Sequence, residues 1–311
     1  MFSTFRFLAR KMTPIFRNFL VFSSLILGAQ ASGCLQHSFN NVSVTVVGVR
    51  GVDRISGCLE PIGTLEKVSY VQIINQTVPV LYKDAVRDLQ YLVDFVLDGS
   101  QVASVERGSF SNLPLLKLLR LKDNKIREIR EGVFNDLMIT ELNLSNNDIV
   151  RIERGALDRL PNLEVVNFDR NRIQTWNEDW FLQTPNVNTL SFQENEIKRI
   201  PRRAFQNVHG THQIAGRKVM TNIFLNNNLI SDVDPKSLEG ISALGWLFLN
   251  KNEIRVIPDD FLDNIEQIDW LKLNFNQLNC LPEKIFDKVP NVVNYLEGNP
   301  LNEDCKTRFK L

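Results

Sequence analysis

Cysteine and histidine are the side chains of this sequence with the widest chemical repertoire, and both are few. The chain of 311 residues contains four cysteines and three histidines. Cys34 and Cys58 lie toward the N-terminus, Cys280 and Cys305 toward the C-terminus, and no cysteine lies between these two groups. No pair has the C-x-x-C spacing of a zinc site, so metal binding by cysteine is not favoured. The cysteines indicate disulfide chemistry instead, which requires an oxidising compartment.

His209 and His212 form the H-x-x-H spacing of half a metal site or of a pH-sensitive contact. No cysteine or carboxylate lies near them in the sequence, so we interpret them as part of a polar loop. The sequence also lacks a G-x-S-x-G elbow, an H-E-x-x-H motif and a phosphate-binding loop. We therefore expect a non-enzymatic protein with no catalytic residues, no metal and no cofactor.

The first 31 residues predict a compartment in which disulfides form. Four basic residues precede the apolar run Phe19–Leu27, and Ala29-Gln30-Ala31 follows it. These are the three parts of a secretory signal peptide, with cleavage expected after Ala31. The alternatives are a membrane anchor, for which the run is too short, and lipid modification of Cys34; Met12 is an alternative start. The C-terminal residues carry no apolar tail, so we expect a released protein without a membrane anchor.

Secretion makes two disulfides the expected state of the four cysteines, and four cysteines allow three pairings. Their positions favour one local bridge at each end, Cys34–Cys58 and Cys280–Cys305. The sequence also contains three N-x-S/T sequons, at Asn41, Asn75 and Asn143. In a secreted protein these asparagines are candidate glycosylation sites.

An internal repeat determines the fold prediction. A pattern with apolar residues at positions 1, 4, 6 and 11 and Asn at position 9 recurs every 23 or 24 residues, except for one interval of 33. Its first residues are Leu116, Ile139, Leu163, Val187, Met220, Leu244 and Ile268, with degenerate copies beginning at Val68 and Leu92 and a terminal copy at Leu296/Asn299/Leu301. Positions 4 and 6 alternate inward as in a strand, so neighbouring copies are expected to pair in parallel.

This pattern resembles the extracellular leucine-rich-repeat proteins of the 24-residue class, such as Toll-like receptor and Slit-like ectodomains. The resemblance covers about residues 68–301 and implies a horseshoe-shaped α/β-type solenoid, with a parallel sheet on the concave face, irregular or short 3-10 segments on the convex face, and a ladder of position-9 Asn side chains. The expected divisions are a signal peptide at 1–31, an N-terminal cap at 32–67, about nine coils at 68–290 with an insertion near 209–218, and a last coil with a short C-terminal cap at 291–311. The family's usual four-cysteine C-terminal cap is missing.

Positions 3, 5 and 7 of each coil point out from the concave sheet. They are mostly polar or charged in the N-terminal half, where a glycan on Asn143 would block the middle of the face. They turn aromatic in the last four coils, where a partner-binding surface is predicted at Phe224, Trp246, Phe248, Trp270, Phe275 and Tyr295. Trp246 and Trp270 share one column on adjacent strands, and Phe224 and Phe248 share another, so each pair is expected to stack.

A second candidate surface consists of Lys117, Arg120 and Lys122, which suit a sulfated glycan. Asp123 and Glu141 interrupt this group, so a solvated charged surface is the favoured interpretation.

The chain has 36 basic and 36 acidic residues, and cleavage after Ala31 leaves 32 basic against 36 acidic groups. This balance argues against nucleic-acid binding. The resemblance implies a secreted recognition protein in immunity, adhesion or signalling, with an extracellular protein ligand or receptor or a second copy of the chain as partner. The alternative is a matrix component that binds fibrous proteins or glycans.

Overall fold

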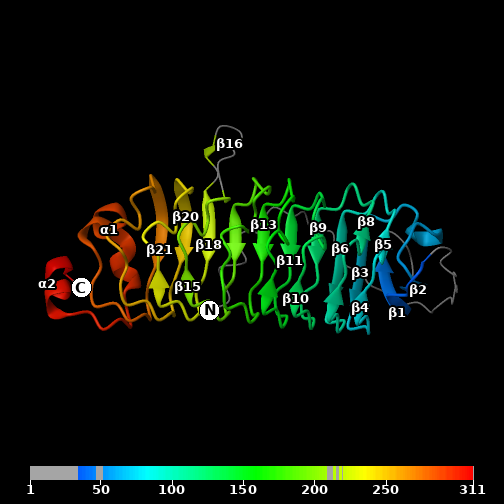
Figure 1. Ribbon diagram of the computed structural model, residues 1–311, viewed down its shortest axis with the longest axis horizontal. Helices are drawn as coiled ribbons and strands as arrows, with labels where there is room; N and C mark the ends of the chain where they lie inside the picture. Colours follow the sequence, from blue (N-terminus) through cyan, green and yellow to red (C-terminus); the bar gives the residue numbers. More distant parts are fainter. Residues whose placement is uncertain (1–33, 47–51, 209–212, 215–216, 219, 311) are drawn as a thin grey trace, which may run out of the picture.

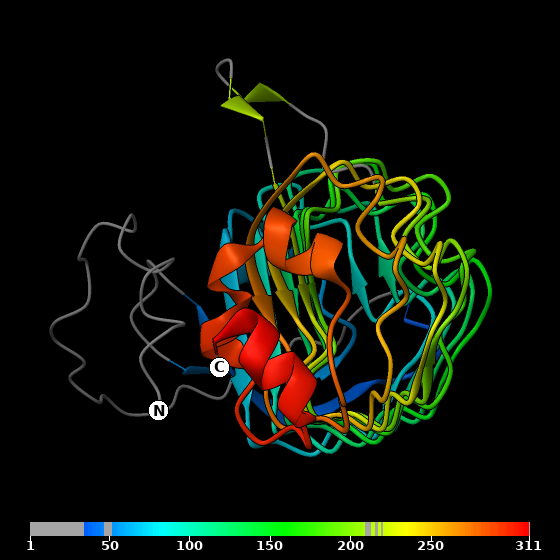
Figure 2. The ribbon, with the colours of Figure 1, turned by 90° about the vertical axis from the view of Figure 1, so that its left-hand side faces the viewer.

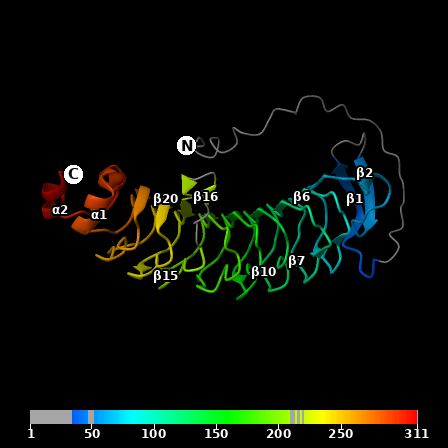
Figure 3. The same ribbon diagram turned by 90° about the horizontal axis from the view of Figure 1, so that it is seen from above.

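The computed structural model describes residues 34–46, 52–208, 213–214, 217–218 and 220–310. The predicted signal peptide and its cleavage site after Ala31 lie outside these residues, as do His209 and His212 of the insertion. The described chain forms one elongated, curved solenoid (Figure 1). Seen from above, the strands of the main sheet follow the concave edge, and β7, β10 and β15 follow the opposite edge (Figure 3).

The main sheet has eleven strands in the order β2-β1-β3-β6-β9-β11-β13-β14-β18-β20-β21. Every neighbouring pair from β3 to β21 is parallel, as the repeat predicts. The bounds of these strands are β1 (Phe39–Val46), β2 (Val52–Gly57), β3 (Tyr70–Ile74), β6 (Asp94–Asp98), β9 (Leu118–Arg120), β11 (Glu141–Asn143), β13 (Val165–Asn167), β14 (Thr189–Ser191), β18 (Thr221–Phe224), β20 (Ala243–Phe248) and β21 (Gln267–Lys272).

The predicted asparagine ladder is confirmed. In Asn276, Oδ1 accepts a hydrogen bond from the backbone N–H of Ile254 at 3.1 Å, and Nδ2 donates to the carbonyls of Leu249 and Leu273, both at 2.9 Å. Ile254 and Leu249 belong to the preceding coil, so each rung joins two coils and satisfies buried groups that would otherwise be costly. The same backward contacts are made by Asn124, Asn147, Asn171, Asn195, Asn228, Asn252 and Asn299.

The convex side consists of turns and two-residue strands that pair in parallel between neighbouring coils. These pairs are β4 (Val80–Leu81) with β7 (Ser104–Val105), β5 (Val86–Arg87) with β8 (Phe110–Ser111), β10 (Glu128–Ile129) with β12 (Arg151–Ile152), and β15 (Arg199–Ile200) with β19 (Asp232–Val233). The apolar side chains of this side are buried, among them Ile129, Phe134, Leu137, Ile200, Phe205, Ile257, Phe261 and Ile265. The core therefore runs the length of the solenoid between the two sides.

Position 8 of the repeat adopts a left-handed backbone in every coil, a feature that the sequence analysis did not predict. The turn after each strand needs this conformation, and Asn, Asp and Gly adopt it most readily. The residues are Asn75, Gly99, Asp123, Asn146, Arg170, Glu194, Asn227, Lys251, Phe275 and Gly298, with φ from +53° to +76°. Phe275 is the bulkiest of them, and its ring packs against Gly298, where an added Cβ would collide with it.

The two ends of the sheet are covered by different structures. At the N-terminal end, within the predicted cap, β1 pairs antiparallel with both β2 and β3, and Cys34 is bonded to Cys58.

At the C-terminal end, helix α1 (Glu283–Lys288) and the 3-10 helix η3 (Pro290–Tyr295) precede the last turn. The terminal helix α2 (Glu303–Phe309) closes this end and is drawn in red in Figure 2. Cys305 of α2 is bonded to Cys280, and the Asn302 side chain caps the helix by accepting from the Cys305 N–H at 2.8 Å. Both disulfides have the pairing that the cysteine positions favour.

The insertion between β14 and β18 contains two short antiparallel strands, β16 (Gln213–Ile214) and β17 (Arg217–Lys218). They project away from the solenoid in Figures 1 and 2. A separate observation concerns membranes: no helix within the described ranges has the length and apolar character to cross one.

Candidate functional site on the concave face

The strand register brings the predicted aromatic residues together on the last coils of the concave face. Trp246 lies opposite Trp270, and Phe224 lies opposite Phe248, so both predicted columns are confirmed. Tyr295 continues the Phe248 column, since the Leu273 N–H bonds the Tyr295 carbonyl at 3.2 Å. We call Phe224, Trp246, Phe248, Trp270 and Tyr295 the aromatic cluster.

The ring contacts within the aromatic cluster differ from the predicted stacking of each column. The ring of Phe224 meets Phe248 edge to face, with centroids 5.2 Å apart, and lies 5.7 Å from Trp246. Trp246 also stacks on Phe248 at 6.1 Å, whereas Trp270 packs edge to face with Tyr295 at 5.7 Å. The two tryptophans therefore occupy separate groups of rings.

Exposure separates the members of the cluster. Phe224 is only 8% exposed, so the prediction that it is an exposed contact residue is wrong: Trp246 and Phe248 cover it. Trp246, Phe248 and Tyr295 are partly buried, and Trp270 is 39% exposed. Trp246 and Phe248 therefore rest on a buried phenylalanine, whereas Trp270 packs on Tyr295.

Phe275 lies beside the aromatic cluster rather than in it. It occupies the left-handed turn after β21, is 45% exposed, and packs on Gly298. Among the residues that the structure describes, no ring contact joins Phe275 to the other five predicted aromatics.

Lys272 is a member of this surface that the sequence analysis missed. It occupies position 5 of its coil, between Phe248 and Tyr295, and its Nζ lies 4.2 Å from the centroid of the Phe248 ring and 5.3 Å from that of Tyr295. Burial lowers the pKa of the Lys272 ammonium from its ordinary value. The two groups of rings therefore meet at a single cation.

A buried acceptor lies next to Phe224. Asn226, at position 7, is buried, and its Oδ1 has no hydrogen-bond partner in the described part of the chain. An unpaired buried amide oxygen is uncommon in a folded protein and draws attention to its site.

The N-terminal half of the concave face is acidic. The carboxylate of Asp98 accepts hydrogen bonds from Arg120 Nε at 2.7 Å and from the Lys122 N–H at 3.1 Å. Burial raises the pKa values of Asp98, Asp94 and Glu141, and the Arg120 charge opposes this shift at Asp98 and Glu141. The Arg120 guanidinium therefore interacts with carboxylates of the concave face itself, Asp98 and Glu141.

The predicted basic candidate surface is engaged internally. Arg120 bonds Asp98, the Lys122 Nζ lies 3.4 Å from the Asp123 carboxylate, and the Lys117 Nζ donates to the Met138 carbonyl at 3.5 Å. These contacts favour the interpretation of Lys117, Arg120 and Lys122 as a charged surface without a dedicated anion.

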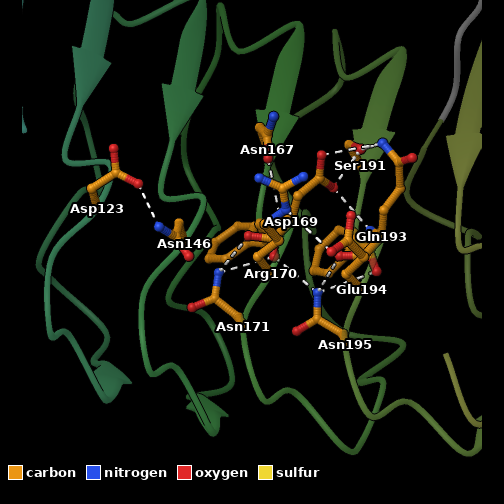
Figure 4. Close-up of polar contacts among 12 residues, drawn as sticks. Asp123, Asn146, Asn167, Asp169, Arg170, Asn171, Ser191, Gln193, Glu194 and Asn195 are labelled. Atoms are coloured by element: carbon orange, nitrogen blue, oxygen red, sulfur yellow. Dashed lines mark hydrogen bonds and ion pairs between the residues drawn. The ribbon is translucent and has the colours of Figure 1, made fainter. Parts of the chain in front are cut away.

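A polar network lies in the middle of the concave face, between the acidic and aromatic parts (Figure 4). Asp169 accepts hydrogen bonds from the Ser191 hydroxyl at 2.6 Å, the Gln193 N–H at 2.9 Å and the Gln193 Nε2 at 3.1 Å. Burial raises the pKa of the Asp169 carboxyl, and these hydrogen bonds oppose the rise. The network crosses from the β13 coil to the β14 coil and fixes the middle of the face.

The sequons differ in their surroundings. Asn41 and Asn75 are exposed. Asn143 is partly buried on the concave face, where its Oδ1 accepts from the Ser145 N–H at 3.1 Å and from the Ser145 hydroxyl at 2.8 Å. The described residues hold no cluster of three or more His, Cys, Asp or Glu that could bind a metal ion.

Residues 90–149, 138–186, 161–214 and 218–293 match the sequence family described as leucine rich repeat. No curated protein matches the chain.

Among solved structures, the chain is similar to a complex of TLR13 with ssRNA13, with 21% identity, a TM-score of 0.51 and coverage of 62% of this chain and 28% of that one. It is similar to a leucine-rich-repeat protein from Leptospira interrogans, with 22% identity, a TM-score of 0.53 and coverage of 71% and 53%. A third is the octameric complex of Latrophilin 3, Unc5D and the repeat domain of FLRT2, with 20% identity, a TM-score of 0.54 and 75% of each chain covered. The chain thus spans less than two thirds of the length of the first two, and these likenesses concern the fold.

Proposed function

Because the chain belongs to the leucine-rich repeat family, we propose that it is a non-enzymatic module that binds a protein partner through the C-terminal half of its concave face. The observation that carries the proposal is the aromatic cluster, in which Trp270 is 39% exposed and Trp246, Phe248 and Tyr295 are partly exposed. Aromatic residues that gather on an accessible surface are typical of the energetic centre of a protein interface. The unpaired Oδ1 of Asn226 supports the same location.

The compartment we propose is extracellular. The signal-peptide pattern of residues 1–31, two disulfides and the exposed sequons at Asn41 and Asn75 support it. The mature protein then begins after Ala31, and immunity, adhesion or signalling are the processes that suit such a module. One structure of similar fold contains FLRT2 within a complex of several proteins, which supports a protein partner.

A protein partner is favoured over a nucleic acid, although TLR13, whose fold is similar, is found with ssRNA13. The N-terminal half of the concave face carries Asp94, Asp98 and Glu141, which would repel phosphates. Single-stranded RNA nevertheless belongs in the test.

The test is a binding screen of the purified chain against arrayed extracellular proteins, with collagen, heparin and single-stranded RNA in the same array. We expect a protein ligand whose affinity falls about 30-fold or more in Trp246→Ala and Trp270→Ala, the loss typical of a central interface aromatic. Tyr91→Ala is the matched control, because Tyr91 is 52% exposed and lies outside the cluster.

Ligands that bind both tryptophan variants as tightly as the unaltered chain would contradict the proposed surface. Binding to collagen or heparin alone would favour the matrix role. Light scattering of the same samples identifies a second copy of the chain as the partner, since a dimer through the cluster would dissociate in both tryptophan variants.

A further inference from the structure

Lys272 is placed unlike Arg120, the other cation at position 5 of the described coils. Lys272 and Arg120 both occupy position 5 of their coils, in β21 and β9. Arg120 is neutralised, because its guanidinium bonds the Asp98 carboxylate at 2.6 Å. Lys272 contacts two aromatic rings instead, with its Nζ 4.2 Å and 5.3 Å from their centroids.

Within the described residues, no ion pair or hydrogen bond of the Lys272 ammonium is found. The nearby Asp269 carboxylate is an acceptor for Gln267 Nε2 at 3.1 Å. The segments outside the described ranges contain no Asp or Glu side chain. Burial lowers the pKa of the Lys272 ammonium. Within the described ranges, this cation therefore contacts aromatic rings and has no counter-ion.

A partly desolvated ammonium gains most from an anion that approaches it where water is already displaced. Lysine is a single point charge, whereas recognition of phosphate or sulfate by side chains usually employs arginine forks or several cations. The rings of Phe248, Tyr295 and Trp270 next to Lys272 suit an apolar group at the same time. One carboxylate beside one apolar side chain matches this arrangement.

Resting on the function proposed above, we propose that Lys272 is the anion-recognising residue of the aromatic cluster and that the partner is a polypeptide with an Asp or Glu carboxylate adjacent to an apolar side chain. The carboxylate pairs with the Lys272 ammonium, and the apolar side chain packs on Trp270. The neighbouring rings hold the lysine side chain in place, so that little conformational freedom is lost when the anion binds.

The experiment selects peptides from a random displayed library on the immobilised full chain and removes those that also bind Trp270→Ala. We expect the remaining peptides to share an Asp or Glu next to an apolar residue. Replacing that acid by its amide (Glu by Gln) weakens binding to the unaltered chain and to Lys272→Arg about tenfold or more, as for a partly buried charge pair. The same replacement changes binding to Lys272→Met less than about twofold, because the charge that it pairs with is gone.

Lys251→Met is the matched control, since Lys251 is an exposed lysine in the turn after the preceding strand. It should retain the preference for acid over amide. The acid and amide peptides are compared on the same variant. A general destabilisation of Lys272→Met would therefore weaken the binding of both peptides and could not by itself remove the preference for the acid. Trp270-dependent peptides without a preference for acid would overturn the inference and leave the proposed function standing. Recovery of no Trp270-dependent peptide would overturn both.

Discussion

Removal of one rung of the asparagine ladder provides a sharp test of the forces that hold the solenoid together. Asn276 is 1% exposed, and its amide accepts from Ile254 N–H and donates to the Leu249 and Leu273 carbonyls. In Asn276→Ala, the N–H of Ile254 and the carbonyls of Leu249 and Leu273 each lose their hydrogen bond to the Asn276 amide. Since an unpaired buried group costs about 1–3 kcal/mol, we expect a loss of about 3–5 kcal/mol in the free energy of unfolding.

Asn274→Ala is the matched control, because Asn274 lies two residues earlier in the same coil, is only partly buried, and occupies position 7 on the concave face. Urea unfolding followed by circular dichroism and tryptophan fluorescence measures both variants, and two probes are needed because repeat arrays can unfold in stages. The control should lose less than about 1 kcal/mol, as surface substitutions usually do. Equal losses in the two variants would refute the reasoning that the rung, and not the packing of the coil, supplies the stability.

Two further predictions concern the carboxylates and the C-terminal disulfide. Burial raises the folded-state pKa of Asp169, so its contribution to stability is fully present below the ordinary pKa of an aspartate and is lost as the pH rises through the folded-state value. Asp169→Asn should therefore flatten the fall of the thermal midpoint between acidic and neutral pH, and an unchanged pH profile would show that the carboxyl is not protonated more readily in the folded chain. Replacing Cys280 and Cys305 together by Ala opens a loop of 25 residues, which should cost about 3 kcal/mol and increase amide hydrogen exchange in α2. Unchanged exchange in α2 would indicate that Asn302 and the packing of Phe309 on Phe286 hold the helix without the bond.

The sequence predicted the features that depend on spacing. Copies 23 or 24 residues apart place equivalent residues on neighbouring strands, so the pairing of Trp246 with Trp270 and of Phe224 with Phe248 follows directly. The ladder was predictable for a related reason, since a buried amide that recurs at one position needs the same partners in every coil. An N-terminal cap was also expected, and the antiparallel pairing of β1 with β3 shows how it covers the edge of the first parallel strand.

The features that depend on side-chain conformation were not predictable. Position 5 points outward, yet Phe224 is covered because the rings of Trp246 and Phe248 pack over it. Lys272 was overlooked because its residue type suggests a solvated surface, while its long stem reaches the faces of two rings. Phe275 shows the same limit, since position 8 turns left-handed for a reason of backbone geometry that the side chain's type does not reveal.

The direction of the asparagine ladder has a consequence for how the chain acquires its structure during synthesis. Each rung reaches backward: the amide of Asn276 satisfies groups of the coil that precedes it, as Asn252 does for the coil before that. A coil that has just left the ribosome therefore still lacks the partner of its own buried N–H. The hydrogen bonds of that coil form only when about one more repeat has emerged. The folded part of the solenoid therefore ends one coil before the growing end of the chain. The last coils, which carry the aromatic cluster and Lys272, are the final ones to be fixed.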